Sequence, residues 1–416
     1  RRRFEPDPPH QITFRNEPTS MMKKQRDLAP DVLRGFALFG ILVVNIPFMA
    51  LSSENGARGE FVQGAFNGSV ALIMLALFAG KFYLLFSFLF GYSSGYIIQN
   101  EKRNRARWVR RCLLLMVFGA LHFTFLWHGD ILFFYGILGL LLIAFLFRTE
   151  RTLKIWTRII YSTSSVILVA LGSLIYIGER YFPEESNAPI PDSRLDEVLR
   201  NSTFLESIAP RVDLWVWGSL GAGLLLQGGF AFAAFLYGLR AQRTGLLTEP
   251  FDSQRTSRMI KNGLIFGLPF QLALAIVAIR NEQSADVSEA INLITLFLAF
   301  MAAPLLSMVY VGLILKFLVI RPRLVTWMAP AGKMSLTVYI GESIFASLIF
   351  GPWGLGLFQK LDIWAVMLVA LGIWLTLVWF STFWLKRFRQ GPLEWVMYQL
   401  TRSRGAAITL DRAGNN

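Results

Sequence analysis

The strongest candidate for chemistry is a histidine followed eight positions later by a carboxylate, in the segment LHFTFLWHGDI at 121–131. His122 lies 11 residues after Arg111, which is roughly 17 Å along an α-helix. Gly129 offers a hinge that would fold Asp130 back toward the imidazole. A histidine held by a carboxylate is a competent general base, because the carboxylate fixes its tautomer and supports its cation.

The histidine also has a simpler interpretation, as a hydrogen-bonding residue that holds two helices together. No metal site is expected, because the three histidines (His10, His122 and His128) are few and scattered. No nucleotide-binding motif stands out, and the sequence predicts no bound cofactor. Cys112 is the single cysteine, which excludes a disulfide framework.

Arg34 and Asn45 lie on one apolar segment near the start of the chain. Arg34 either forms an ion pair with Asp31 where the helix begins, or faces a cavity and binds an anionic group such as a phosphate. Asn45 lies three turns further along, where an amide usually joins neighbouring helices.

Lys81 and Glu342 are ionisable residues within apolar segments, where a charge is costly. Lys81 begins its segment at the predicted outer end, so its ammonium is expected to reach water. Glu342 falls near the bilayer midplane and must be paired, protonated or facing a wet cavity. Tyr339 precedes it by three positions and shares its surroundings.

Ten apolar segments are long enough to position these residues across a membrane. About 20 apolar residues span a hydrocarbon core roughly 30 Å thick. A further apolar run at 70–79 is too short, and is either an interfacial helix or an extension of the second span. The predicted spans are 33–51, 80–99, 110–127, 131–147, 155–178, 214–239, 260–279, 290–315, 333–351 and 363–385.

The charges at the ends of these segments predict the orientation. With both termini in the cytoplasm, the five inner segments hold 23 basic against 5 acidic residues, and the five outer segments hold 7 against 15. The net charge of +14 therefore reflects topology and a lipid bilayer as partner, not nucleic acid. We expect an all-α polytopic membrane protein with about ten transmembrane helices, both termini cytoplasmic.

Three polar segments flank or interrupt the transmembrane domain, which covers 27–402. The tail 1–26 is polar and proline-rich, and is expected to be disordered or to bind a protein partner. The segment 179–213 is predicted to be an extracytoplasmic loop that forms either a cap or a short amphipathic helix near 195–208. The residues 403–416 form a C-terminal tail.

Five motifs in this order resemble those of the bacterial YeiB family, catalogued as a membrane domain of unknown function. The resemblance covers about 27–402 and places the chain in the bacterial cytoplasmic (inner) membrane. The motifs are DVLRGFALFGILVVN (31–45), KFYLLFSFLFG (81–91), LHFTFLWHGDI (121–131) with Tyr135 and Gly136, GKMSLTVY (332–339) and FRQGPLEW (388–395).

The resemblance implies a relation to a superfamily of transmembrane acyltransferases. These proteins transfer an acyl group from a cytoplasmic donor, often acyl-CoA, to an acceptor on the far side. In one branch a basic residue, ten intervening residues and a catalytic histidine lie on the first helix. Here Arg34 and the spacing are present, but Asn45 stands at the histidine's position. An amide cannot act as a general base, which leaves His122 as the intramembrane histidine able to replace it.

Two functional hypotheses follow. In the first, the protein is an acyltransferase in which Arg34 holds the donor's phosphates and His122, oriented by Asp130, deprotonates the acceptor. Glu342, Lys81 and Tyr339 then shape the cavity or polarise the carbonyl. In the second, the protein is a transporter or an accessory subunit of a larger membrane complex. One closed cavity that joins Arg34, His122 and Asp130 would favour the enzyme.

Overall fold

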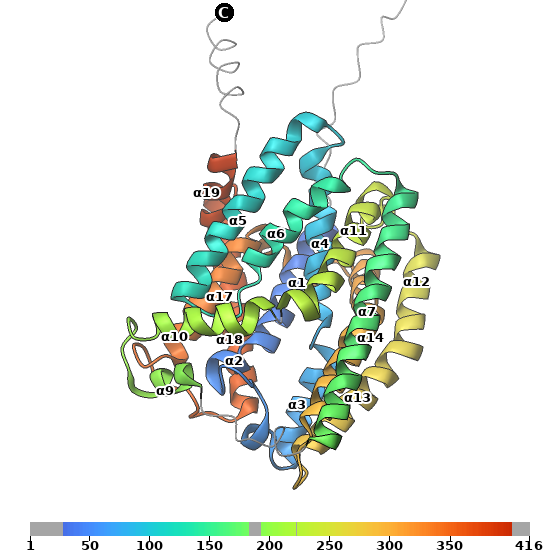
Figure 1. The fold of residues 1–416 in the computed structure, drawn as a ribbon. Helices are drawn as coiled ribbons and strands as arrows, with labels where there is room; N and C mark the ends of the chain where they lie inside the picture. Colours follow the sequence, from blue (N-terminus) through green and yellow to red (C-terminus); the bar gives the residue numbers. More distant parts are fainter. Residues whose placement is uncertain (1–27, 183–192, 222, 402–416) are drawn as a thin grey trace, which may run out of the picture.

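The computed structural model describes residues 28–182, 193–221 and 223–401, and within these ranges it consists of helices and connecting turns without a β-strand. Figure 1 shows the helices gathered into one bundle. The predicted tails, 1–26 and 403–416, and part of the predicted outer loop lie outside the described residues. The helices of the bundle are α1 (Leu28–Asn45), α3 (Ala65–Leu77), α4 (Lys81–Ile98), α5 (Arg105–Phe125), α7 (Glu150–Tyr181), α11 (Gly229–Arg243), α13 (Leu268–Glu282), α14 (Glu289–Ile320), α17 (Ser335–Phe350) and α18 (Ile363–Arg387).

Shorter helices connect the members of the bundle or cover its ends. Two π-helical segments, Leu214–Leu220 and Gly223–Gly228, lead into α11, and a third, Gly263–Gly267, joins α12 to α13. The short α-helices are α2 (Pro47–Ala50), α6 (Leu132–Leu141), α9 (Arg194–Asn201), α10 (Ile208–Asp213), α12 (Ser253–Asn262), α15 (Arg323–Thr326), α16 (Ala329–Lys333) and α19 (Pro392–Thr401). The helix predicted near 195–208 is present as α9.

Seven helical segments of the described chain are long and apolar enough to cross a membrane, and each matches a predicted span. The prediction of an all-α, multi-pass membrane protein is therefore confirmed. The seven are Leu28–Asn45, Ala65–Ile98, Lys102–Phe125, Glu150–Tyr181, Ser253–Glu282, Glu289–Ile320 and Ile363–Arg387.

The other three predicted spans are shorter or interrupted. The span predicted at 131–147 is α6 with one further turn to Ala144, and the span at 333–351 is α17. The span at 214–239 is divided between the π-helical segments and α11. At 1.5 Å per residue, the 16 residues of α17 reach only about 24 Å, which is less than the hydrocarbon thickness. The count of ten and the placement of the termini remain predictions.

The apolar run at 70–79 belongs to α3, which a three-residue turn joins to α4 within the apolar segment Ala65–Ile98. Gly80 lies in the turn with a φ of 78°, a left-handed conformation that glycine adopts without strain. Lys81 begins α4 immediately afterwards. Lys81 therefore lies in the interior of the segment Ala65–Ile98 and not at its end.

The crossing of α1 with α16 depends on two glycines. A Cβ atom added at Gly332 would overlap the carbonyl oxygen of Asp31, and one added at Gly35 would overlap the carbonyl oxygen of Met328. The indole of Trp374 also donates a hydrogen bond of 3.0 Å to the carbonyl of Gly35. The backbones approach this closely only because both glycines lack side chains.

Glu394 of α19 caps the start of α17. Its Oε1 accepts hydrogen bonds from the backbone amides of Leu336 (2.7 Å) and Thr337 (3.1 Å), and its Oε2 accepts one from the Thr337 hydroxyl (2.6 Å). These amides lie in the first turn of α17, where helix donors lack intrahelical partners. The motifs at 332–339 and 388–395 thus meet at one capping contact.

Replacing Glu394 by alanine is expected to lower the free energy of unfolding by about 2 kcal/mol, because two amides lose their acceptor. The matched control is Glu101→Ala, which removes a half-exposed carboxylate bound to Arg103 and should cost about 0.5 kcal/mol or less. Thermal unfolding in detergent measures both. Equal losses in the two variants would contradict the capping role.

Candidate functional site

A cavity of about 1000 Å³ lies in the half of the bundle that holds α2, α3, α9 and α10. Figure 1 shows this half opposite the end formed by α19 and the connection from α4 to α5. By the predicted orientation, the cavity belongs to the outer half of the membrane. Its walls come from the end of α1, the loop 53–58, the loop 127–131, the π-helical segments, α13 and α14.

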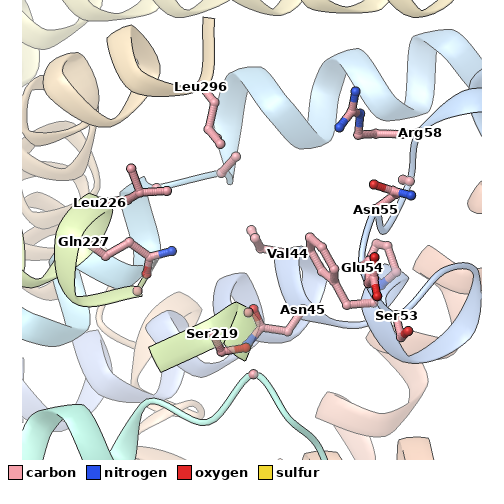
Figure 2. A pocket seen from close by; sticks show the side chains of 18 of the residues that line it. Val44, Asn45, Ser53, Glu54, Asn55, Arg58, Ser219, Leu226, Gln227 and Leu296 are labelled. Atoms are coloured by element: carbon pink, nitrogen blue, oxygen red, sulfur yellow. The ribbon is translucent and has the colours of Figure 1, made fainter. Parts of the chain in front are cut away.

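The lining of the cavity is mostly apolar, with polar groups interspersed. Figure 2 shows Leu226 and Gln227 on one side and Asn55 and Arg58 on the other. An apolar cavity with a few polar groups is typical of a small-molecule site, and this volume suits a ligand with both an apolar and a polar part. The polar lining residues include Asn45, Ser53, Glu54, Asn55, Arg58, His128, Asp130, Ser219, Gln227, Gln271, Asn292 and Thr295.

One wall of the cavity contains an ion-pair network around Arg58. Its Nε lies 2.7 Å from Oε1 of Glu282, and its Nη2 lies 2.7 Å from Oε1 of Glu289. The other oxygen of Glu282 accepts from the amide of Gly59 at 2.7 Å. Burial lowers the pKa of Arg58, but the hydrogen bonds to Glu289 and Glu282 outweigh burial and leave that pKa above its usual value. Because its charge is neutralised, Arg58 does not make this wall attractive to anions.

His122 forms hydrogen bonds through both ring nitrogens. Its Nδ1 lies 2.8 Å from Oδ2 of Asp130, and its Nε2 lies 2.8 Å from Oγ of Ser343. The other carboxylate oxygen of Asp130 accepts from the amide of Phe133 at 2.8 Å. All three side chains are buried: the residues His122 and Asp130 are each 1% exposed and Ser343 is 4% exposed. The predicted approach of Asp130 to the imidazole is confirmed as a contact.

The contacts determine where the imidazole carries its proton. A carboxylate only accepts hydrogen bonds, so Nδ1 of His122 must donate to Asp130. The lone pair of Nε2 then accepts from the hydroxyl of Ser343. This is the protonation state that a general base requires, with the basic nitrogen directed at an oxygen that carries a proton.

Helix α17 supplies the other side of this site. The ring of Tyr339 lies 5.0 Å from the imidazole of His122, centroid to centroid, and its hydroxyl accepts a long hydrogen bond of 3.4 Å from the amide of Ile131. Glu342 is 3% exposed, and its Oε1 has no hydrogen-bond partner among the described residues. Tyr339 therefore lies beside His122, but Tyr339, Glu342 and Lys81 are not among the residues that line the large cavity, so the structure does not show them shaping it.

Ser343 and His128 were not identified from the sequence. Ser343 lies one turn after Tyr339 on the same face of α17, but no local signal in the sequence connects it with His122. His128 lines the cavity, and its Nδ1 has no hydrogen-bond partner among the described residues. Burial, with a smaller effect of Arg211, lowers the pKa of His128 to about 3, so this histidine is neutral near pH 7.

Asn45 and Lys81 have different surroundings. Asn45, at the end of α1, lines the cavity beside Val44 (Figure 2), in agreement with a binding role. Lys81 does not reach water, contrary to the prediction. Its Nζ donates to the carbonyl of Leu75 and to the Oε1 of Gln271, both at 2.8 Å, and the residue is fully buried. The prediction was wrong because α3 covers the start of α4.

Arg34 forms an ion pair with Asp31, with 2.8 Å between Nη1 and Oδ1, and its Nη2 donates to the hydroxyl of Ser93 at 2.6 Å. It lies outside the lining of the cavity, as does His122. The single closed cavity expected to join Arg34, His122 and Asp130 is therefore not found in the described part of the chain. The cavity reaches Asp130, and His122 lies behind it.

Comparisons with known proteins identify relatives of the whole chain. Residues 241–404 match a family model described as protein of unknown function (DUF418). The chain is similar to Uncharacterized protein YxaH of Bacillus subtilis (strain 168), with 30% identity over 396 residues, 89% of this chain and 93% of the relative. It is also similar to Uncharacterized protein YeiB of Escherichia coli (strain K12), with 28% identity over 416 residues, 92% of this chain and 99% of the relative. No solved structure matches the chain.

Proposed function

Because the chain belongs to the YeiB family of bacterial multi-pass membrane proteins, we propose that it is a transmembrane acyltransferase of the cytoplasmic membrane. The observation that carries the proposal is the imidazole of His122, which has a carboxylate on Nδ1 and a hydroxyl on Nε2 beside a large cavity. This arrangement suits a general base that removes a proton from an attacking oxygen or nitrogen.

The cavity suits an acceptor that is amphiphilic and uncharged or cationic. Its apolar walls suit a hydrocarbon part, and its amides suit hydroxyl or amine groups. Arg58 is neutralised by its two carboxylates, and the exposed charges of the lining are two carboxylates, Glu54 and Asp213, and one cation, Arg194. Carboxylates outnumber free cations there, which disfavours an anionic headgroup.

The donor in this proposal is a thioester such as acyl-CoA, which approaches from the cytoplasmic end. Arg107, Arg110 and Arg111 lie in the first two turns of α5, and the Nε atoms of Arg110 and Arg111 have no hydrogen-bond partner among the described residues. A cluster of arginines suits the phosphates of a nucleotide-linked donor. His122 lies roughly 17 Å further along α5, which is comparable to the length of a pantetheine arm. Tyr339, whose ring lies 5.0 Å from the imidazole of His122, would polarise the carbonyl.

Acyl-CoA binding and turnover by the purified protein test the proposal, with His122→Ala beside the wild type. We expect wild-type turnover and a loss of about 10²- to 10⁴-fold in His122→Ala, with binding retained, because the general base is removed and the donor site is not. Cys112→Ala, a change in the same helix, is the matched control and should turn over like the wild type. Absence of both binding and turnover in the wild type would refute the proposal.

A non-enzymatic transporter or accessory subunit is the second candidate. The observation that favours it is that His122, Arg34 and Lys81 are each bonded to neighbouring side chains, as in a network that only holds helices together. In that case His122→Ala would lower the melting temperature without changing any acyl-CoA turnover.

A further inference from the structure

We propose that Ser343 is the nucleophile of this site and carries the acyl group covalently between donor and acceptor. This inference rests on the acyltransferase function proposed above. The arrangement of hydroxyl, imidazole and carboxylate is that of a Ser-His-Asp triad, with 2.8 Å at each of its two contacts. The three residues come from α17, α5 and the loop before α6, so the fold and not the local sequence brings them together.

The hydroxyl of Ser343 is directed differently from those of other serines in these helices. A helical serine commonly donates to the carbonyl one turn earlier. Ser87, Ser93 and Ser381 do so, with donor–acceptor distances of 2.9, 2.6 and 2.7 Å. Ser343 instead contacts Nε2 of His122. Its proton therefore faces the basic nitrogen, as a nucleophile requires.

The first half-reaction acylates the serine. Oγ of Ser343 attacks the thioester carbonyl carbon while its proton moves to Nε2 of His122. The carbon–sulfur bond breaks, and the imidazolium returns the proton to the departing sulfur, which leaves as a thiol. Asp130 stabilises the imidazolium throughout. The product is an ester on Ser343 with the donor released.

The second half-reaction regenerates the serine. A hydroxyl or amine of the acceptor attacks the ester carbonyl and gives its proton to Nε2 of His122. The bond from carbon to Oγ breaks, and Oγ recovers the proton. The donor and the acceptor then need not be bound at the same time, and they can arrive from opposite sides of the membrane.

The loop 127–131 separates Ser343 from the large cavity. Trp127 and His128 line that cavity and also line a second, small cavity of about 20 Å³, which Ser347 borders one turn after Ser343 on α17. Ser343 itself lines neither cavity, so a substrate in the large cavity reaches it only if this loop moves. The loop also contains Asp130, so an acceptor in the large cavity and the other two members of the triad would contact the same loop.

The test is to trap the acyl-enzyme on the full-length protein. The protein in detergent is incubated with acetyl-CoA or palmitoyl-CoA, quenched in acid, and analysed by intact-mass and peptide mass spectrometry. We expect the acyl mass on the peptide that contains Ser343 in the wild type and in Ser381→Ala. Ser381 is a matched control because it is a buried serine bonded only within its helix. In Ser343→Ala the acyl label should be absent, and the rate of acyl transfer should fall about 10³-fold or more.

A second variant keeps the proposal testable if the Ser343→Ala protein does not fold. Ser343→Cys retains a proton on the side chain and should carry the acyl group as a thioester, which neutral hydroxylamine cleaves much faster than an ester. Transfer by Ser343→Ala within threefold of the wild type, together with loss in His122→Ala, would overturn the serine and keep the acyltransferase. No turnover of acyl-CoA by the wild type would overturn both.

Discussion

Replacing Asp130 by asparagine is expected to reduce acyl transfer about 10⁴-fold while the protein remains folded. The amide oxygen can still accept from the amide of Phe133, as Oδ1 of Asp130 does at 2.8 Å. The NH₂ group then faces Nδ1 of His122 as a donor. The imidazole must accept there, so its proton moves to Nε2. That nitrogen can then no longer accept the proton of Ser343. The general base is lost, although the fold is retained.

Steady-state acyl transfer and the melting temperature, measured on the same preparation, test this prediction. Asp286→Asn is the matched control, since Asp286 is exposed in the connection between α13 and α14 and lies outside the cavity lining. It should retain wild-type transfer. If Asp130→Asn kept transfer within tenfold of the wild type, the tautomer would not matter, and His122 would not be the base.

Replacing Gly332 by valine is expected to have the largest effect on stability, a loss of about 3 kcal/mol or more. A side chain there would overlap the carbonyl of Asp31, and the neighbouring Gly35 is already in close backbone contact with Met328. Backbone atoms on both sides cannot move away as a flexible side chain can. The two helices would have to separate, which would also displace the start of α17.

Gly372→Ala is the control for the glycine prediction. No atom lies within 4 Å of a Cβ added at Gly372, in the exposed face of α18. Alanine should be neutral there or stabilise the helix by up to about 1 kcal/mol. Thermal unfolding monitored by tryptophan fluorescence compares the two variants. A Gly332→Val protein as stable as Gly372→Ala would show that the crossing of α1 and α16 can relax.

The sequence predicted the parts of this protein that depend on nearby residues. Length and apolar composition identified seven segments that the structure forms as helical segments long and apolar enough to cross a membrane. The contact between His122 and Asp130 was also predictable, because both residues lie in one motif with a glycine hinge. Local spacing was sufficient in both cases.

The errors concern residues whose partners lie far away in the chain. Ser343 is 221 positions from His122, and single-sequence spacing cannot show that α17 packs beside α5. Lys81 was expected in water because the turn at Gly80 was not foreseen, and Gln271, its partner, lies 190 positions away. Of the two interpretations of Arg34, the structure shows the ion pair with Asp31, and the guanidinium also donates to the hydroxyl of Ser93.

The cavity stops at the loop 127–131, and its lining in the described part of the chain does not continue to Arg34. An open pore would let protons and ions run down their gradients, and a single-sided cavity does not. If an acyl group passes through this protein, it crosses the sealed region as part of a covalent bond and not as a dissolved molecule. Acyl transfer across the membrane would then proceed without leakage of protons or ions, and the electrochemical gradient would be retained.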